Sequence, residues 1–516
     1  MARVATRRPA PQMNQTSLPA AVGGWNARDP WAEMDPRDAI VMDNWFPGAA
    51  DIEVRGGYAS HATGMTGQIQ TLMTYTNATT AALFAAVGTE FYAVTSAGAV
   101  GAAAVTGLSN AQWYWLNMRT AGGAYLYAAN GADSPRLYDG AAWTAITGAS
   151  TPAITGVTTT TLIYPFLWKR RLWFVQKDTM SAWYLPVDSV GGAASEINFG
   201  PLFSRGGYLV AGMAMTIDAG EGMDDYLVLI TSRGQVALYA GTDPASASTF
   251  ALRGVFDVSP PVGRRCLMRY GGDVIAITRD GFLPLSSVLP SSQTGNRSRA
   301  LSDKIRDAVS SATASYGSTY GWEATLYPDG PAILFNVPTA VGSQQQYVMN
   351  TVTGQWCRFT GWAANCFALL NDALYFGGAN VVYKAWTTNA DAGVAIPGEV
   401  MHAYNYYGSR GRVKHFKLAR PVFVADGSPS ISMAMNVDFE DDQPTAPVTI
   451  SSGTAGVWDS ATWDNAVWGG TPSVRRDWQG IGNIGTAGAL RLRSSSSGII
   501  VRWSATDVLM EVGGVL

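Results

Sequence analysis

The sequence predicts a mainly β protein: a β-propeller with an added antiparallel β platform domain formed together with the N-terminal segment. Short apolar strands recur in pairs, joined by tight turns, along most of the 516 residues. These pairs follow one another at roughly 40–50 residues, which is the period of propeller blades built from short strands. The 57 glycines, 25 prolines and 47% apolar residues favour strands and turns over long helices.

Strand pairing is expected in seven hairpins. Their strands cover residues 83–87 with 91–94, 125–129 with 136–138, 172–175 with 182–185, 226–230 with 235–239, 274–278 with 282–285, 325–327 with 332–337, and 373–376 with 381–386. Five turns contain glycine, at Asn130-Gly131, Arg233-Gly234, Asp280-Gly281, Asp329-Gly330 and Gly377-Gly378. Glycine tolerates the positive φ that tight hairpins need, so the turn chemistry agrees with the strand pattern.

Two stretches predict aromatic plugs between neighbouring blades. Asp139-Gly140 leads to Trp143, and residues 350–356 read NTVTGQW. Each has a polar turn, then glycine, then an aromatic side chain of a size that fills the gap between two packed sheets.

The chain is expected to have four parts. Residues 1–23 are a flexible, basic arm, and residues 24–64 an anchoring segment in which residues 38–45 form a short helical turn. Residues 65–390 form the propeller, with a helical insertion near 300–312 that has Ser302 as its N-cap. Residues 391–516 form the C-terminal β platform domain.

Charge and hydropathy limit the classes of partner. Charged residues make up 14% of the chain, against about 25% in an average globular protein, which favours surface buried between subunits. The net charge of −3 gives no basic field for stable nucleic-acid binding. No run of about 18 apolar residues is present, so no transmembrane segment is expected. The N-terminus, with Arg3, Arg7 and Arg8, lacks the apolar run of a secretory signal.

The three cysteines predict buried apolar positions rather than chemistry. Cys266, Cys357 and Cys366 cannot all pair with one another and show no metal-type spacing. We expect buried, reduced side chains in a protein made in a reducing cytoplasm.

Catalytic signatures are not found in the sequence. Its three histidines, His61, His402 and His415, form no HExxH or related motif, and neither a GxSxG elbow nor a phosphate loop occurs. Carboxylate clusters at residues 224–225 and 440–442 and at Asp477 are read as turns or solvated loops. We therefore predict no enzymatic activity, no cofactor and no metal site.

A basic segment, residues 408–420, is one candidate interface. Arg410, Arg412, Lys414 and Lys417 are expected to share one face of an extended strand and could contact phosphates. The alternatives are a solvent-exposed face of an amphipathic strand, or a contact with an acidic neighbour in an assembly.

A second candidate interface contains three tryptophans. Trp458, Trp463 and Trp468 lie five residues apart, so an extended chain points successive rings to opposite faces. This spacing favours packing or an interface over a flat platform for sugars.

Several stretches resemble the tail nozzle, or tail tubular protein B, family of short-tailed bacteriophages. They read GGWNARDPWAEMDPRDAIVMDNWFP with VRGGY, NGADSPRLYDGAAWTAITGAS, VGRRCLMRYGGDVIAITRDGFLPLS and YGSRGRVKHFKLARP. The similarity covers most of residues 24–420. It contains no catalytic signature and therefore concerns lineage.

The resemblance implies a virion protein, made in the host bacterial cytoplasm, that forms a homohexameric ring at the distal end of a short tail. Such rings meet an adaptor ring, offer docking surfaces for tail fibres, close the DNA channel before infection and conduct genome ejection. Double-stranded DNA would pass only transiently, and hairpin tips such as Arg233 and Asp280 would face the lumen. The alternatives are a receptor-binding propeller that recognises glycans and, less favoured, a polysaccharide hydrolase.

Overall fold

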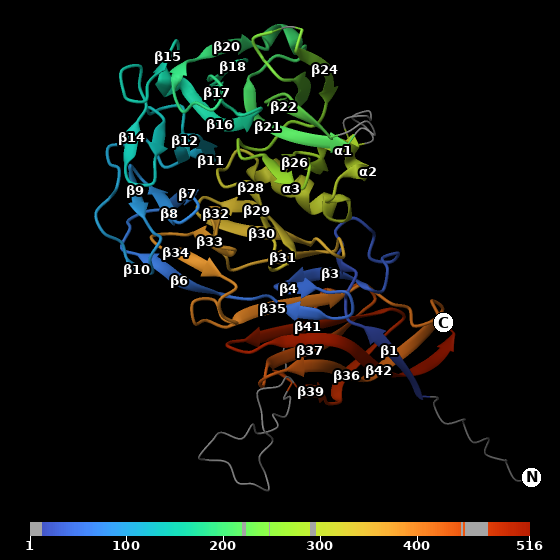
Figure 1. The fold of residues 1–516 in the computed structure, drawn as a ribbon. Helices are drawn as coiled ribbons and strands as arrows, with labels where there is room; N and C mark the ends of the chain where they lie inside the picture. Colours follow the sequence, from blue (N-terminus) through green and yellow to red (C-terminus); the bar gives the residue numbers. More distant parts are fainter. Residues whose placement is uncertain are drawn as a thin grey trace, which may run out of the picture. The chain divides into compact units, whose positions relative to one another are not determined.

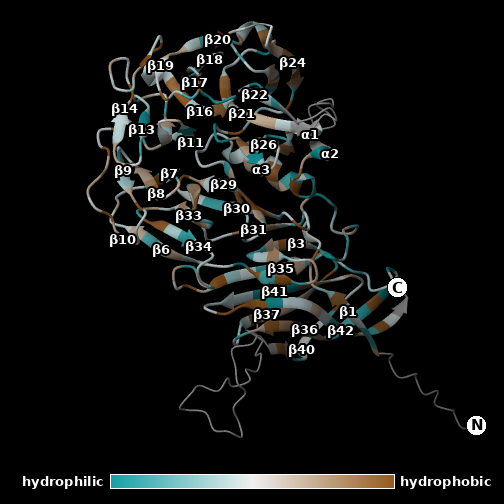
Figure 2. Ribbon diagram, in the orientation of Figure 1, coloured by the Kyte–Doolittle hydropathy of each residue, from teal (hydrophilic) through white to brown (hydrophobic). Residues whose placement is uncertain are grey.

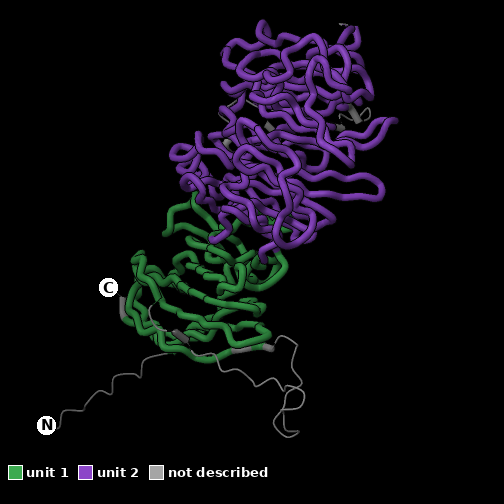
Figure 3. Tube along the Cα trace, turned by 90° about the vertical axis from the view of Figure 1, so that its left-hand side faces the viewer, with its two compact units in different colours: residues 1–58, 349–360, 386–516 green, residues 59–348, 361–385 purple. Residues whose placement is uncertain are grey.

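The computed structural model describes residues 13–218, 223–246, 248–288, 296–444, 447–448 and 473–515. In this part of the chain the fold is mainly β, with many small antiparallel sheets and few helices (Figure 1), which confirms the predicted class. The chain forms two compact units (Figure 3). Unit 1 comprises residues 1–58, 349–360 and 386–516, and unit 2 comprises residues 59–348 and 361–385.

Unit 2 contains seven groups of neighbouring strands that follow one another along the chain; six belong to sheets of three to five strands, and one is part of a ten-stranded sheet. The first five are β7 (Ile69–Thr76), β8 (Ala81–Val87) and β9 (Glu90–Ala93); β11 (Tyr114–Thr120), β12 (Gly123–Ala129), β13 (Arg136–Tyr138) and β14 (Trp143–Ala145); β16 (Leu162–Trp168), β17 (Arg171–Gln176), β18 (Ser181–Tyr184) and β20 (Ser195–Asn198); β21 (Leu209–Asp218), β22 (Met223–Thr231), β23 (Gln235–Gly241) and β24 (Phe250–Asp257); and β25 (Leu267–Tyr270), β26 (Asp273–Thr278) and β27 (Gly281–Pro284).

The last two groups follow a short helical region. One contains β28 (Glu323–Tyr327), β29 (Ala332–Ala340) and β30 (Ser343–Asn350), which are part of the ten-stranded sheet. The other contains β32 (Cys366–Leu370), β33 (Ala373–Gly377) and β34 (Val382–Ala385) together with β6 (Tyr58–Thr63) and β10 (Gly98–Ala99). Because β6 lies beside β34, this sheet joins the beginning of unit 2 to its end.

All seven predicted hairpins are present as antiparallel strand pairs. At one of them the need for glycine is clear. Gly234 has φ +78°, and a Cβ there would lie 2.3 Å from the carbonyl oxygen of Val258. The local turn chemistry was therefore enough to predict these pairings.

Neighbouring sheets of unit 2 pack through apolar faces (Figure 2). The predicted aromatic at Trp143 packs against Phe84 and Phe91 of the preceding sheet, with ring centroids 5.1 Å apart in both cases. The carboxylate of Asp139 accepts the backbone N–H groups of Ala141 and Ala142, which fixes the turn before it. The expectation of an aromatic plug between sheets is confirmed at this position.

Two helical expectations need correction. Residues 38–45 do not form a helical turn, because Asp38–Asp43 is strand β3, which pairs with β2 (Gly24–Trp25) and with β35 (Ile396–His402). The predicted insertion contains a 3₁₀ turn, Asp303–Ile305, followed by α3 (Arg306–Tyr316). Ser302 is not its side-chain cap, since its hydroxyl accepts the N–H of Phe282 instead. Two shorter helices, α1 (Leu285–Val288) and α2 (Asn296–Arg299), precede this insertion.

Unit 1 combines strands from both ends of the chain in two sheets. One sheet has the order β39 (Ser473–Arg476), β36 (Arg412–Ala425), β42 (Val501–Val515), β5 (Ile52–Val54) and β4 (Trp45–Pro47), with β1 (Met13–Pro19) also on β42 and β40 (Gln479–Gly485) also on β36. The other is the ten-stranded sheet that also contains β2 and β28–β30; unit 1 contributes β31 (Trp356–Phe359), β3, β35, β41 (Gly488–Ser496), β37 (Ser430–Val437) and β38 (Pro447–Val448). Trp503 connects the two sheets, because its ring packs against Trp45 of its own sheet and against His402 of the other.

A buried arginine holds the three stretches of unit 1 together. Arg55 donates two hydrogen bonds to the carboxylate of Asp391, at 2.8 and 2.6 Å. It also donates to the side-chain oxygen of Asn44 at 2.8 Å and to the carbonyl of Thr360 at 2.7 Å. The Arg55 side chain is fully buried, so each partner compensates for the loss of water around the guanidinium.

No helix in the described part of the chain is long and apolar enough to cross a membrane.

Candidate functional site

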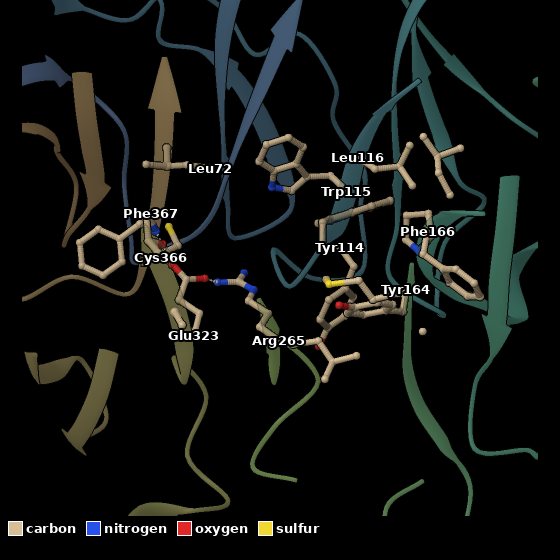
Figure 4. A pocket seen from close by; sticks show the side chains of 18 of the residues that line it. Leu72, Tyr114, Trp115, Leu116, Tyr164, Phe166, Arg265, Glu323, Cys366 and Phe367 are labelled. Carbon is tan, nitrogen blue, oxygen red and sulfur yellow. Dashed lines mark hydrogen bonds and ion pairs between the residues drawn. The ribbon is translucent and has the colours of Figure 1, made fainter. Parts of the chain in front are cut away.

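Unit 2 contains a cavity of about 380 Å³ that is lined by one strand from each of its seven strand groups (Figure 4). The lining strands are β7, β11, β16, β21, β25, β28 and β32. The cavity is thus lined by strands from along the whole of unit 2, and it is the candidate site of this unit.

An arginine–glutamate pair lies on the cavity wall. Arg265 donates from Nη1 to Oε2 of Glu323 at 2.7 Å, and the two side chains are 13% and 11% exposed. Its Nη2 donates to the carbonyl of Gln70 at 2.6 Å and to the hydroxyl of Thr71 at 2.9 Å, and it also contacts the Tyr320 hydroxyl. This one guanidinium thus connects the segment just before β25 with β7 and β28.

Glu323 also forms hydrogen bonds that connect neighbouring strands. Its second carboxylate oxygen accepts the backbone N–H of Phe367, at the start of β32. Burial raises the pKa of Glu323, and the Arg265 guanidinium opposes that rise. Because both oxygens are occupied by protein groups, the geometry favours a structural role over acid–base chemistry.

The remaining walls are largely aromatic. The rings of Tyr114 and Tyr164 lie 5.5 Å apart, and Trp115 and Phe166 line the same cavity. Tyr164 has φ +51°, an uncommon value for a residue other than glycine, at an irregularity in the pairing of β16 with β17. Burial raises the pKa of both tyrosines, so their phenols stay neutral near physiological pH.

The cysteines behave as predicted. All three are unpaired and buried. Burial raises the pKa of Cys266 and Cys366 to about 12, and raises that of Cys357 as well. Neutral thiols of this kind are poor nucleophiles, so Cys366 in the cavity lining acts as a small apolar group.

The four basic candidates of residues 408–420 do not share one face. Lys414 is buried, and its Nζ donates to the carbonyls of Ser409, of Arg412 at 3.0 Å and of Thr486 at 2.7 Å. Burial lowers the pKa of Lys414. Lys414 therefore supports a turn and is not available to phosphate.

The other three basic residues are placed differently from one another. Arg410 forms an ion pair with Glu33 at 3.1 Å, and Lys417 one with Glu511 at 3.3 Å, whereas Arg412 is exposed at the start of β36. Arg410 lies before β36, and a shift in register separates Arg412 from Lys414. Lys414 and Lys417 are three positions apart, an odd spacing that does not give one face of a regular strand.

The remaining candidates lie elsewhere. Arg233 is exposed in the turn between β22 and β23, and Asp280 lies in the turn between β26 and β27. Neither lines the cavity, and their placement at a channel stays a prediction. Trp458, Trp463 and Trp468 fall outside the described residues.

Sequence reasoning missed the two buried arginine networks. Arg55 and Asp391 are 336 residues apart, and Arg265 and Gln70 are 195 apart. No local pattern marks such pairs, although both arginines stand next to glycine-rich or arginine-rich stretches.

In the part of the chain that the structure covers, no group of three or more His, Cys, Asp and Glu side chains is placed to hold a metal ion.

Comparison with known proteins gives no family. Neither a family model nor a curated protein matches the chain. Among solved structures, a computationally designed protein, Ika8, is 10% identical over 64% of this chain and 99% of its own, with a TM-score of 0.35. The structure of BBS1N in complex with ARL6DN is 12% identical over 42% of this chain and 63% of its own, with a TM-score of 0.29.

Proposed function

We propose that unit 2 is a seven-bladed β-propeller. Seven groups of neighbouring strands follow one another along the chain, and one strand of each lines a common cavity, although β28–β30 also belong to the ten-stranded sheet. The sheet that contains both β6 and β34 pairs the beginning of the unit with its end, as a closed ring of blades requires.

We further propose that the chain is a structural subunit of a short-tailed phage nozzle. It assembles as a hexameric ring that closes the DNA channel before infection and conducts genome ejection. The observation that carries the proposal is the position of the two buried arginines. Arg55 lies in VRGGY and Arg265 in VGRRCLMRY. The strings that resemble the nozzle family therefore contain the arginine that connects segments within unit 1 and the arginine that connects strands within unit 2.

Composition supports an assembled rather than a solitary chain. With 14% charged residues, the protein has little of the charge that keeps monomers apart, and subunit interfaces are depleted in charge. A net charge of −3 also suits a wall past which DNA slides, because strong binding depends on clusters of Lys and Arg.

The test is genetic depletion of the chain from phage particles that contain it. Particles made without it are expected to lack the distal end of the tail and to lose their DNA, and supply of the protein in trans restores both. Intact, infectious particles assembled without the chain would overturn the proposal.

A glycan-binding role is the second candidate, and the aromatic cavity favours it. Tyr114, Trp115 and Tyr164 offer ring faces beside the polar groups of Arg265 and Glu323, a combination that suits sugar recognition. Saturable binding on a glycan array that is lost in Trp115→Ala would support this role. The hydrolase alternative is less favoured, because Glu323 is held by Arg265 and the Phe367 N–H.

A further inference from the structure

One sheet of unit 1 ends in two strands with open edges. β1 pairs with β42 along all of its seven residues, and β40 pairs with β36 (β1 is labelled in Figures 1 and 2, β40 in Figure 2). Among the described residues neither strand has a second strand partner. Since β36 and β42 pair with each other, β1 and β40 lie at opposite edges of the same sheet.

Charge, one of the features that protect isolated sheet edges, is missing from both strands, although β1 ends in Pro19. β1 reads MNQTSLP and β40 reads QGIGNIG, so the two seven-residue strands contain no charged side chain. Gly480 and Gly482 face open space where a Cβ would be. Natural proteins usually block exposed edges with charges, because free backbone N–H and C=O groups recruit another strand.

Apolar side chains are exposed beside the same edges. Ile484 on β40 is 59% exposed, Val474 on the adjoining β39 is 62% exposed, and Met13 on β1 is 47% exposed. An added strand would remove these side chains from water while it satisfies the free backbone groups.

Strand direction allows the two edges to join between copies. β1 is antiparallel to β42, β42 to β36, and β36 to β40, so β1 and β40 run in opposite directions. When a second copy continues the sheet in the same orientation, its β1 is therefore antiparallel to β40 of the first copy. The edges also match in length and in their lack of charge.

We propose that β1 of one copy pairs with β40 of the next, so that this sheet runs on between subunits. Such a contact joins two different surfaces, and contacts of this type make rings when the rotation closes. The inference rests on the proposed ring and supplies its interface, with a second copy of this chain as the partner.

Disulfide cross-linking of the full-length protein tests the pairing. Thr16→Cys and Gly482→Cys place thiols at the centres of the two strands, while the native cysteines are buried. Within one copy the two positions are three strand spacings apart, roughly 14 Å, which is too far for a disulfide. The double variant is expected to form a ladder of covalent oligomers on oxidation.

The single variants are the controls for cross-linking. A dimer from Thr16→Cys alone would mean that β1 pairs with β1, and the absence of a ladder in the double variant would mean that these edges do not meet. Either result overturns the proposal, as does a wild-type protein that stays monomeric at every concentration.

Charge added to the edge gives a second test. Gly480→Lys with Gly482→Lys restores the usual protection and should weaken assembly at least about tenfold, as expected when ladder hydrogen bonds are lost. Gly101→Lys, at another exposed glycine with open space, is the matched control and should assemble as the wild type does. Unchanged assembly of a double variant whose thermal melting is also unchanged argues against the β1–β40 contact.

The interface and the nozzle assignment fail separately. If the chain forms a cross-linked ring but is not found in phage tails, the proposed interface is supported and the nozzle function is overturned. If the chain forms a six-fold ring in the tail without the cross-link, the nozzle function is supported and the proposed interface is overturned.

Discussion

At the scale of single residues, unit 1 depends on the guanidinium of Arg55. Its donors reach Asp391, Asn44 and Thr360, which come from all three stretches of the chain that build the unit. Removal of the arginine leaves the Asp391 carboxylate largely buried without its cation, and that is the costly way to break a buried pair.

Arg55→Ala should therefore lower the free energy of unfolding of unit 1 by about 3–5 kcal/mol. Chemical denaturation followed by the fluorescence of the buried Trp45 and Trp503 measures this change. The matched control is Arg502→Ala, which breaks the exposed pair with Glu53 and should cost less than about 1 kcal/mol. Equal effects of the two substitutions would contradict the account.

His402 makes the stability of unit 1 depend on pH. Its ring is buried against Trp503, and burial lowers its pKa to about 4 from an ordinary value near 6.5. Between these values the unfolded chain binds a proton that the folded chain does not. Stability from this group is therefore full above pH 6.5 and is lost as the pH falls towards 4, up to about 3 kcal/mol.

The measurement is the free energy of unfolding of unit 1 between pH 7 and pH 4, compared with His402→Leu. The variant should lose the part of the slope that His402 contributes, whatever its stability at pH 7. If wild type and variant show the same slope, the buried histidine is not the cause.

The environment of single side chains was predictable from the sequence only where burial alone decides it. Cys266, Cys357 and Cys366 were expected to be buried, and they are. Lys414 was expected on an accessible strand face, as a solvated residue or as a contact to phosphate or to an acidic neighbour, but carbonyls from residues 409, 412 and 486 surround its Nζ. That arrangement depends on the preceding loop and on Thr486, which lies 72 residues later, and no pattern within residues 408–420 reveals it.

At the scale of elements, local signals and distant partners explain which predictions held. The hairpins follow from turn chemistry within a few residues, so the sequence was sufficient for them. Strand β3 was mistaken for a helical turn, because its partner β35 lies more than 300 residues later and decides its conformation. The expected side-chain cap at Ser302 does not form for the same reason, because its hydroxyl accepts the backbone N–H of Phe282 in β27.

Gly234 tests the turn argument directly. Gly234→Ala must adopt a positive φ and bring its Cβ against the Val258 carbonyl, so unit 2 should lose more than about 1 kcal/mol. Gly101→Ala, at a glycine with open space and no positive φ, is the control and should be close to neutral. Thermal melting of both variants makes the comparison, and a neutral Gly234→Ala would show that this turn does not need glycine.

At the scale of the whole molecule, each unit is closed by segments far apart in the sequence. In unit 2, β6 pairs beside β34, and in unit 1, β1 and β5 pair with β42 near the other end of the chain. The contribution of residues 349–360 to unit 1 was not visible in the sequence, because Arg358 meets its partner Asp43 across 315 residues. Composition and the repeat period predict the class of fold, while such long-range pairs decide how the chain is divided.

The proposed role makes a demand on the assembled particle that neither unit can meet alone. A nozzle subunit has to be present in several copies around the tail axis, and its units have to form the wall of a channel. A glycan-binding or hydrolytic protein has no such requirement.

A cryo-EM reconstruction of the phage tail, with density that fits this chain, tests the central claim most directly. The account predicts six copies in a ring at the distal end, beyond the adaptor, with a channel closed before ejection and open after it. Density for the chain outside the tail axis, or its absence from the tail, would contradict it.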